Sequence, residues 1–313
     1  MILIALNRAH ACYFPYSFSS IWSARFTIYG AIFCYLLGGL TAVCGQVYTD
    51  HLRIGVLYDS SQTFLSVNKT RRHIYNTPMD GILGLAWPNL MVGPGVPPIQ
   101  SFVGQLSEES FTLFENCGLG IAVGPLISHL TPSTPSGTIG GLISYGSKDY
   151  RNCDPAWTHT PILLGSEGDA YYWEFNTSNF AIGNEEARQV NGVAVIFYPD
   201  PNIYVIYEMW SKILKITAAK YSSSLGVYAV DCSKISQLPD ITFTISGQQF
   251  AVPSYQYINK IPGEDQNCKL SVDVSYMGKY LLGAPFLRTY CTYFDFSSKR
   301  LCFSRARHPN LIY

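Results

Sequence analysis

The stretch CSKISQLPDITFTISGQQFAVPSYQYI, residues 232–258, decides the class of fold that the chain adopts. Within it, DITFTISGQQFAV alternates apolar and polar residues on both sides of a Ser-Gly pair. Alternation with a period of two is typical of half-buried β-strands, and Gly beside Ser is typical of turns. Similar β-rich runs are HLRIGVLY (51–58), GTIGGLISYG (137–146), YYWEFNTSNFAIG (171–183) and TYCTYFDFSSKRLCFS (289–304). An all-β fold is therefore predicted.

Composition narrows the class of protein further. Of the 313 residues, 48% are apolar and only 13% are charged, which indicates a packed globular chain. Lys plus Arg and Asp plus Glu both total 21, and no basic run occurs, so nucleic acid is not an expected partner. No CxxC or HExxH motif is present, and neither a metal nor a cofactor is predicted.

The segment VAVIFYPDPNIYVIYEMWSKIL, residues 193–214, predicts a buried strand, a turn and a helix. The helical part carries an apolar stripe formed by Ile206, Met209, Trp210, Ile213 and Leu214. A turn between a strand and a helix is a common place to display a catalytic side chain. Here the residue that leaves the strand is Phe197, which is neither an acid, a base nor a nucleophile.

The run FTIYGAIFCYLLGGLTAVCGQ, residues 26–46, contains no charged residue. Its length would span a bilayer, and Arg8 and Arg25 precede it, so a membrane segment over residues 26–45 is one alternative. The other alternative is a buried β-hairpin. The glycines and aromatic residues within the run favour the hairpin.

Cysteines and glycosylation sequons indicate the secretory pathway, with an extracellular or lysosomal location. The chain has nine cysteines, so at least one thiol is free or pairs with another chain. Asn68 and Asn176 each begin an Asn-x-Ser/Thr sequon. Anchoring in a membrane stays open as an alternative through residues 26–45.

Two segments in different halves of the chain resemble each other. DGILGLAWP (80–88) and KYLLGAPF (279–286) each place two aliphatic residues before a glycine. An aliphatic pair followed by Gly suits a strand that passes tightly beside another backbone. The echo predicts two similar lobes.

Three longer motifs resemble the pepsin-like aspartic peptidases of the A1 family, of the pepsin and cathepsin D type. They are MDGILGLAWPNL (79–90), the opening stretch (232–258) and LLGAPFLRTYCTYFDFSSKRLCFSRA (281–306). The resemblance implies a bilobal all-β fold, with residues 14–160 as an incomplete amino-terminal lobe and 161–313 as the carboxyl-terminal lobe. Residues 1–13 stay unassigned.

The resemblance also implies peptide-bond hydrolysis by two aspartates, one from each lobe, which share a water molecule. Each would sit in an Asp-Thr/Ser-Gly turn, but no aspartate of this chain is followed by Thr-Gly or Ser-Gly. FPYSFSSIW (14–22) resembles the family segment that lies after the first catalytic turn, which predicts that the first aspartate is lost by truncation. RFTIYG (25–30) resembles the start of the flap hairpin and places Tyr29 at the flap tyrosine.

The second aspartate is predicted to be lost by substitution. Counting back from the helix at Ile206 places Phe197 on the aspartate, Tyr198 on the hydroxyl residue and Pro199 on the glycine. Phe cannot share a proton or hold a water, and Pro cannot adopt a positive φ. Asp200 is a candidate substitute, but it lies three residues late, where a catalytic carboxyl would be misplaced.

The remaining polar candidates have structural expectations. The resemblance implies a disulfide between Cys232 and Cys268. Cys291 and Cys302 flank a hairpin centred near residues 296–297 and would form a cross-strand bridge if the register places them opposite each other. Asp295 is expected to accept hydrogen bonds in that hairpin. Cys12, Cys34, Cys44, Cys117 and Cys153 receive no predicted partner.

Three functions follow from these observations. The first is a pepsin-family homologue without peptidase activity, which binds a peptide or protein in the cleft between the lobes. The second is an active aspartic endopeptidase whose amino-terminal sequence is incomplete here. The third is a membrane-anchored, non-functional fragment. The first is predicted, because neither catalytic turn is present.

Overall fold

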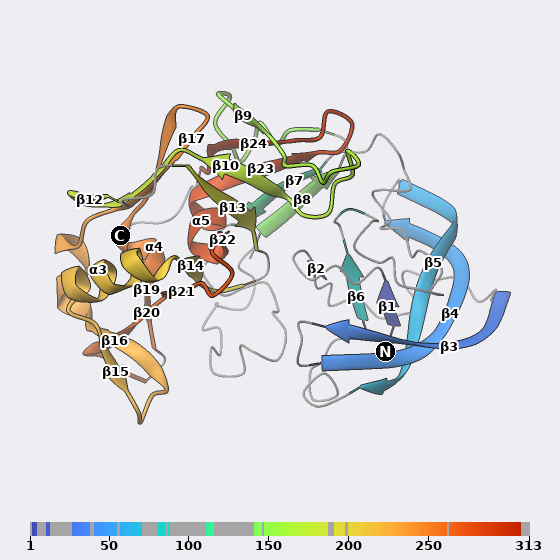
Figure 1. The fold of residues 1–313 in the computed structure, drawn as a ribbon, viewed down its shortest axis with the longest axis horizontal. Coiled ribbons are helices and arrows are strands. Elements are labelled where there is room, and N and C mark those ends of the chain that lie inside the picture. The colour runs from blue at the N-terminus through green and yellow to red at the C-terminus, as the bar shows by residue number, and fades with distance from the viewer. Residues whose placement is uncertain are drawn as a thin grey trace. The chain divides into compact units, whose positions relative to one another are not determined.

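The computed structural model describes residues 2–4, 11–12, 27–37, 41–54, 57–70, 81–84, 87, 111–115, 141–145, 147–186, 191–197, 200–261 and 263–307. The chain divides into two units (Figure 1). The first comprises residues 1–109, 121–128 and 164–173, and the second comprises residues 110–120, 129–163 and 174–313. The predicted boundary between lobes at residues 160 and 161 stays a prediction.

The first unit contains a six-stranded sheet with the strand order β2-β6-β1-β5-β4-β3. Its strands are β1 (Ile2–Ile4), β2 (Ala11–Cys12), β3 (Thr27–Leu37), β4 (Thr41–Ile54), β5 (Leu57–Thr70) and β6 (Gly81–Gly84). Val47 and Leu52 on β4 and Phe64 on β5 are buried, and the rings of Tyr48 and Phe64 stack at 5.9 Å. These apolar side chains stabilise the long β4–β5 pair.

Strands β3 and β4 form an antiparallel hairpin, with Leu37 opposite Thr41 and Thr27 opposite Thr49. The strand pairing of the hairpin alternative is therefore confirmed, and the described part of the run forms two strands and no membrane-spanning helix. In the part of the chain that the structure describes, no helix is both long and apolar enough to cross a membrane.

The described residues of the second unit form four sheets. The first has the order β10-β13-β22-β14-β21 and the second has the order β12-β11-β17-β18. Their strands are β10 (Glu174–Thr177), β13 (Gly192–Ile196), β22 (Tyr280–Leu282), β14 (Ile203–Val205), β21 (Val272–Val274), β12 (Glu185–Glu186), β11 (Asn179–Ile182), β17 (Ile241–Ile245) and β18 (Gln248–Val252).

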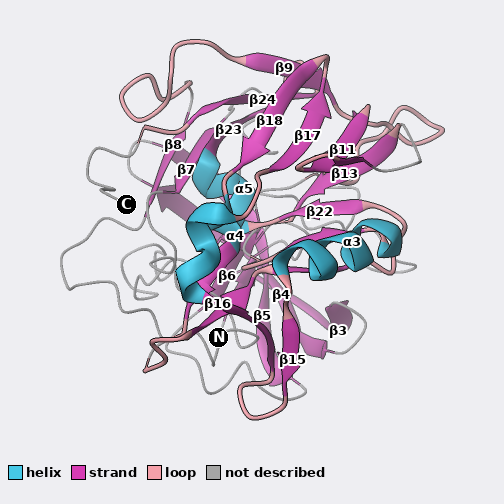
Figure 2. Cartoon of the chain, turned by 90° about the vertical axis from the view of Figure 1, so that its left-hand side faces the viewer, coloured by secondary structure: helices cyan, strands magenta, loops and turns pink. Residues whose placement is uncertain are grey.

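The other two sheets have the orders β15-β16-β20-β19 and β8-β7-β23-β24-β9. Their strands are β15 (Lys220–Ser222), β16 (Val227–Asp231), β20 (Asn267–Leu270), β19 (Ile258–Lys260), β8 (Gly141–Tyr145), β7 (Phe111–Glu115), β23 (Tyr290–Asp295), β24 (Arg300–Arg305) and β9 (Thr158–Pro161). Figure 2 shows β17 beside β18 and β23 beside β24.

The stretch that predicted the fold forms the β17–β18 hairpin. On β17, Ile241, Phe243 and Ile245 are buried and alternate with two less buried threonines. The connecting residues Ser246 and Gly247 have φ values of 49° and 78°. Two consecutive residues with positive φ make the kind of tight turn that matches the twist of paired strands, so this sequence specifies a hairpin.

Helices are few among the described residues. They are α3 (Tyr207–Thr217), the 3-10 helix η4 (Cys232–Gln237), α4 (Ser254–Tyr257) and α5 (Ala284–Thr289). On α3, the predicted stripe buries Met209, Trp210 and Ile213. The sequence IQSFVGQLSEES (99–110) also suggests a helix, and it lies outside the described residues.

Aromatic side chains form much of the core of the second unit. The Phe286 ring lies 5.9 Å from Phe243, 6.3 Å from Phe250 and 5.4 Å from Phe303. All four rings are buried, so α5 and the strands around it share one apolar cluster. Such rings bury large areas and favour tilted or edge-to-face contacts.

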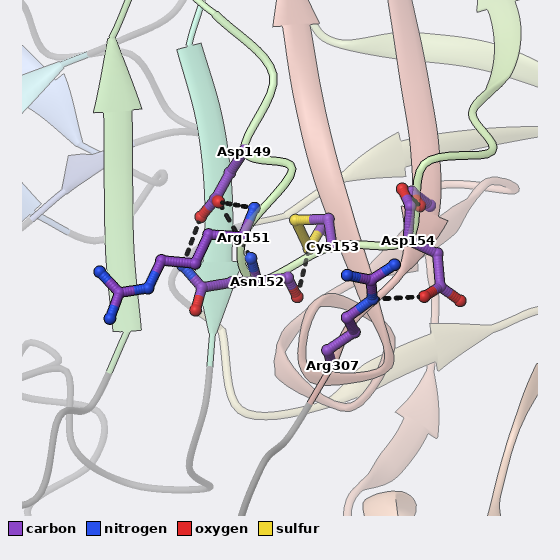
Figure 3. Close-up of polar contacts among 8 residues, drawn as sticks. Asp149, Arg151, Asn152, Cys153, Asp154 and Arg307 are labelled. Atoms are coloured by element: carbon purple, nitrogen blue, oxygen red, sulfur yellow. Dashed lines mark hydrogen bonds and ion pairs between the residues drawn. A yellow bond between two sulfur atoms is a disulfide. The ribbon is translucent and has the colours of Figure 1, made fainter.

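Disulfides and a capped turn hold the edges of this unit together (Figure 3). Cys153 is bonded to Cys291 on β23, and the Asp149 carboxylate accepts hydrogen bonds from the backbone of Arg151 and Asn152. Arg307 and Asp154 form an ion pair at 2.7 Å (Figure 3). The segment preceding β9 is thereby tied to β23 and to the residues that follow β24.

The predicted Cys291–Cys302 bridge is wrong, because the hairpin register separates the two residues. Cys291 lies opposite Ser304, whereas Cys302 lies opposite Tyr293. Cys291 pairs with Cys153 instead, at a Cα–Cα distance of 6.0 Å. The predicted Cys232–Cys268 disulfide is confirmed, with a Cα–Cα distance of 5.2 Å.

Candidate functional site

The candidate site lies between β13 and β14, where the structure describes Phe197 and residues 200–202. Strand β22 lies between these two strands, parallel to β13 and antiparallel to β14. The chain therefore leaves β13, turns beside the end of β22 and returns on its other side. Phe197 is the first residue after β13, and its N–H donates to the carbonyl of Leu282 at 2.9 Å. The predicted turn is present, and the short strand β14 follows it before α3 begins.

The loop is packed against the residues that follow β22. The N–H of Ala284 donates to the carbonyl of Asp200 at 2.7 Å. A Cβ atom at position 283 would overlap the carbonyl oxygens of Asp200 and Asn202. Only Gly283 allows this approach of two backbones, which explains the glycine after the aliphatic pair in KYLLGAPF.

Phe197, Tyr204 and Asp200 form one connected group. The half-buried Phe197 meets the Tyr204 ring edge-to-face at 6.1 Å. The Tyr204 hydroxyl donates to Asp200 Oδ2 at 3.2 Å, and the Asn202 N–H donates to Asp200 Oδ1 at 2.9 Å. The side-chain amide of Asn202 donates to the Tyr204 hydroxyl at 3.4 Å. Both Asp200 oxygens are thus held by residues of their own loop and of β14.

Burial raises the pKa of Asp200 to about 6, although the bonds from Asn202 and Tyr204 and the charge of Lys269 oppose the shift. Asp273 adds to the rise as a second negative charge. Burial also raises the pKa of Tyr204 and lowers the pKa of Lys269. A carboxyl with a perturbed pKa beside a charged partner is a typical property of functional sites.

The geometry limits the chemistry that the loop can perform. The position at the end of β13 carries a benzyl side chain, which offers no proton and no lone pair. Asp200 is the acid of the loop, but its oxygens bond to Asn202 and Tyr204. The assignments of Phe197 to the catalytic position and of Asp200 as its substitute stay predictions.

Sequence reasoning did not find the partners of Asp200. Tyr204 lies four residues later in the same segment, so spacing alone could have suggested it. Lys269 and Asp273 come from β20 and β21, which lie far along the chain. Their proximity depends on the pairing of β14 with β21, which no local pattern reveals.

The first unit contains the same strand arrangement. Strand β6 runs parallel to β1 and antiparallel to β2, and it carries the echo motif of the sequence. Ile4 lies opposite Leu83, as Ile196 lies opposite Leu282. The chain between β1 and β2 reads Ala-Leu-Asn-Arg-Ala-His, which contains no acidic residue.

The other predicted positions are dispersed. Tyr29 lies on β3 and Asn68 on β5, and their side chains are outside the described set. Asn176 lies on β10 and is exposed. Asp295 accepts hydrogen bonds from Ser297 and Ser298 in its hairpin, as expected. Within the described ranges, no group of three or more His, Cys, Asp or Glu side chains is placed to hold a metal ion.

Cys302 is a buried free thiol. Its Sγ lies 3.0 Å from Nδ1 of His159, the residue opposite it on β9. Burial raises the pKa of Cys302 to about 11, so its thiol is protonated at neutral pH. A protonated, buried thiol is a poor nucleophile.

The comparisons with known proteins agree on the class. The family model described as eukaryotic aspartyl protease matches residues 6–306, so the chain belongs to this family. Aspartic protease 1 of Caenorhabditis elegans is 32% identical over 278 residues, which cover 85% of this chain and 64% of that protein. Cathepsin D of Dictyostelium discoideum is 27% identical over 282 residues, which cover 86% of this chain and 66% of that protein.

A solved structure shows the same fold. The aspartic proteinase from Irpex lacteus matches with a TM-score of 0.75 and 17% identity, over 98% of this chain and 91% of that one. The predicted all-β, pepsin-like fold is confirmed. The chain spans between 55% and 64% of the length of the first curated relatives that it matches.

Proposed function

We propose that this chain is a pepsin-family homologue that binds a peptide or protein segment without hydrolysing it. The observation that carries the proposal is Phe197 at the end of β13. In this strand arrangement the residue after β13 is the one that the turn presents. A side chain without an ionisable group cannot serve as the acid or the base that activates the water.

The segment between β1 and β2 supports the same conclusion. It occupies the corresponding place in the chain order of the first unit, and it has no carboxyl. The mechanism requires two carboxyls with different protonation states. Loss of one side would already abolish this division of roles, and here neither side supplies an acid in the position that the strands define.

The ligand class follows from the family. The family resemblance implies a peptide-binding cleft between two lobes, and the proposed ligand is a peptide or a protein segment. The sequons at Asn68 and Asn176, and the Cys153–Cys291 and Cys232–Cys268 disulfides, support a place in the secretory pathway.

An active peptidase is the second candidate, and Asp200 is the residue that favours it. Its carboxyl is largely shielded from solvent, and its pKa is raised to about 6, as in many catalytic acids. The orientation of the carboxyl opposes this role, because both oxygens bond to Asn202 and Tyr204.

Binding and cleavage are tested on the same sample. The purified full chain is incubated with a peptide library derived from a denatured protein, and bound peptides are recovered and sequenced. The proposal expects retained peptides of full length. Shortened peptides with new termini would show hydrolysis, and a library that passes through unretained would contradict the binding role.

A further inference from the structure

The loop after β13 contains a buried acid that the proposed binding function does not use. Asp200 packs against β14, β20, β21 and the junction of β22 with α5. The charged groups that act on it are Lys269 on β20 and Asp273 on β21. The junction contributes only backbone at Gly283 and Ala284.

One distance and one buried oxygen fit a protonated Asp200 carboxyl better than an ionised one. The Tyr204 hydroxyl lies 3.2 Å from Asp200 Oδ2. A hydroxyl that donates to a carboxylate usually lies at about 2.5–2.7 Å. In addition, Asn202 Oδ1 is buried in the same loop without a donor. A protonated Asp200 carries an O–H donor, whereas a carboxylate offers only acceptors.

The backbone of Asp200 and Asn202 is tightly packed, so it cannot shift slightly when the Asp200 carboxyl changes its charge. Gly283 is in contact with the carbonyls of Asp200 and Asn202, and the Ala284 N–H donates to the former. Close-packed elements of this kind hold discrete arrangements and do not deform continuously. A carboxylate formed here would be attracted by the positive charge of Lys269. It would be repelled by the Asn202 Oδ1 atom, which accepts no hydrogen bond.

We propose that Asp200 is a proton-operated clasp: while protonated it holds residues 200–202 against Gly283 and Ala284, and loss of the proton releases this segment. This inference goes beyond the proposed binding function, since it concerns the loop itself and not the ligand. The direction is fixed by the burial of the carboxyl, because removing a charge from water is costly and the neutral form avoids that cost.

Amide hydrogen exchange of the full chain between pH 5 and pH 7.5 tests the clasp, with rates corrected for the intrinsic effect of pH. If opening returns Asp200 to its ordinary pKa of 3.8, protection of the Ala284 amide should fall by up to about tenfold across this range. The Phe250 amide, in the β17–β18 hairpin, is the internal reference and should stay constant.

Two variants separate the clasp from other pH effects. Asp200→Asn should show no fall in Ala284 protection, because the amide does not titrate. Lys269→Met should move the midpoint of the fall to higher pH, since the charge of Lys269 favours the carboxylate. Should Asp200→Asn lose protection at Phe250 as well, Tyr204→Phe replaces it, and its midpoint should also rise.

The outcomes are exclusive. A pH-dependent fall that Asp200→Asn abolishes, with a shifted midpoint in Lys269→Met, supports the clasp. An equal fall in Asp200→Asn, or no fall in the wild type, overturns it. None of these readouts depends on cleavage or peptide binding, so failure of the clasp is distinct from failure of the proposed function.

Discussion

Strands β1, β6 and β2 in the first unit pair in the same directions as β13, β22 and β14 in the second. In each case the sequence of the central strand leads through an aliphatic pair to a glycine, which is the last residue of β6 and the first residue after β22. In each case the residue that follows the first outer strand in the sequence, Ala5 or Phe197, is not an aspartate. The two units therefore share one strand arrangement, and the loss of its catalytic side chains in both units stays a prediction.

The comparison teaches which residues such an arrangement requires. Strand pairing depends on β-branched and aliphatic residues, and the close approach depends on a glycine without Cβ. A catalytic carboxyl adds a charge whose burial costs free energy. The fold therefore gains no stability from it and does not require it. The close backbone contact at Gly283 does not depend on the side chain at position 197, so the strand arrangement tolerates Phe197.

Removal of the Cys153–Cys291 disulfide should have the largest effect, and it tests how far the second unit depends on its crosslinks. The bond joins residues 138 positions apart, so the unfolded chain gains much conformational entropy when it is removed. The double variant Cys153→Ser/Cys291→Ser should lose about 4 kcal/mol in the free energy of unfolding, measured in urea. Cys302→Ser is the control and should lose about 1 kcal/mol. An equal loss in both would contradict the account.

Gly283→Ala should follow, with a loss of about 3 kcal/mol, because its Cβ would overlap two backbone carbonyls. The control Gly278→Ala has free space but a φ of 67°, and should lose about 1 kcal/mol. Gly84→Ala sharpens the comparison between the units. A loss as large as that of Gly283→Ala would show the same close approach beside β6, and a negligible loss would show that the units differ there.

Asp200→Asn should change the dependence of stability on pH. The folded-state pKa of Asp200 is raised above its ordinary value, so its protonated form stabilises the fold below pH 3.8, and this contribution is lost as the pH rises toward 6. The variant should be more stable than the wild type by about 2 kcal/mol at pH 7.5 and equal to it at pH 4. Thermal unfolding at both pH values checks this, and a constant difference would refute the assignment.

The Asp154–Arg307 ion pair should matter least. Both side chains are nearly half exposed, so solvent screens their attraction. Arg307→Gln should change the free energy of unfolding by about 0.5 kcal/mol or less, and the small difference should vanish in 1 M salt. A loss several times larger would mean that the residues after β24 depend on this pair.

Local patterns in the sequence predicted those parts of the fold that local forces determine. The Ser246-Gly247 turn and the alternation on β17 specify a hairpin without help from the rest of the chain. The stripe on α3 placed its buried face correctly. Strand β14 was missed because it is only three residues long and is defined by its pairing with β21 and β22.

The candidate site was predicted only in part, for the same reason. Phe197 follows from counting along one segment, but Lys269 and Asp273 reach Asp200 through strands that are distant in sequence. The predicted partner of Cys291 was wrong because the approximate centre of a hairpin does not determine which residues of its two strands lie opposite each other. A shift of two residues places Cys302 opposite His159 and Tyr293.

Cleavage of a denatured protein by the purified chain at acidic pH, with and without pepstatin, tests the central claim most directly. The central hydroxyl of pepstatin mimics the tetrahedral centre that two aspartates would hold. The account predicts no cleavage beyond that of a buffer control, and no difference between the wild type and Asp200→Asn. Pepstatin-sensitive cleavage that Asp200→Asn abolishes would contradict it, and would make Asp200 the acid that replaces Phe197.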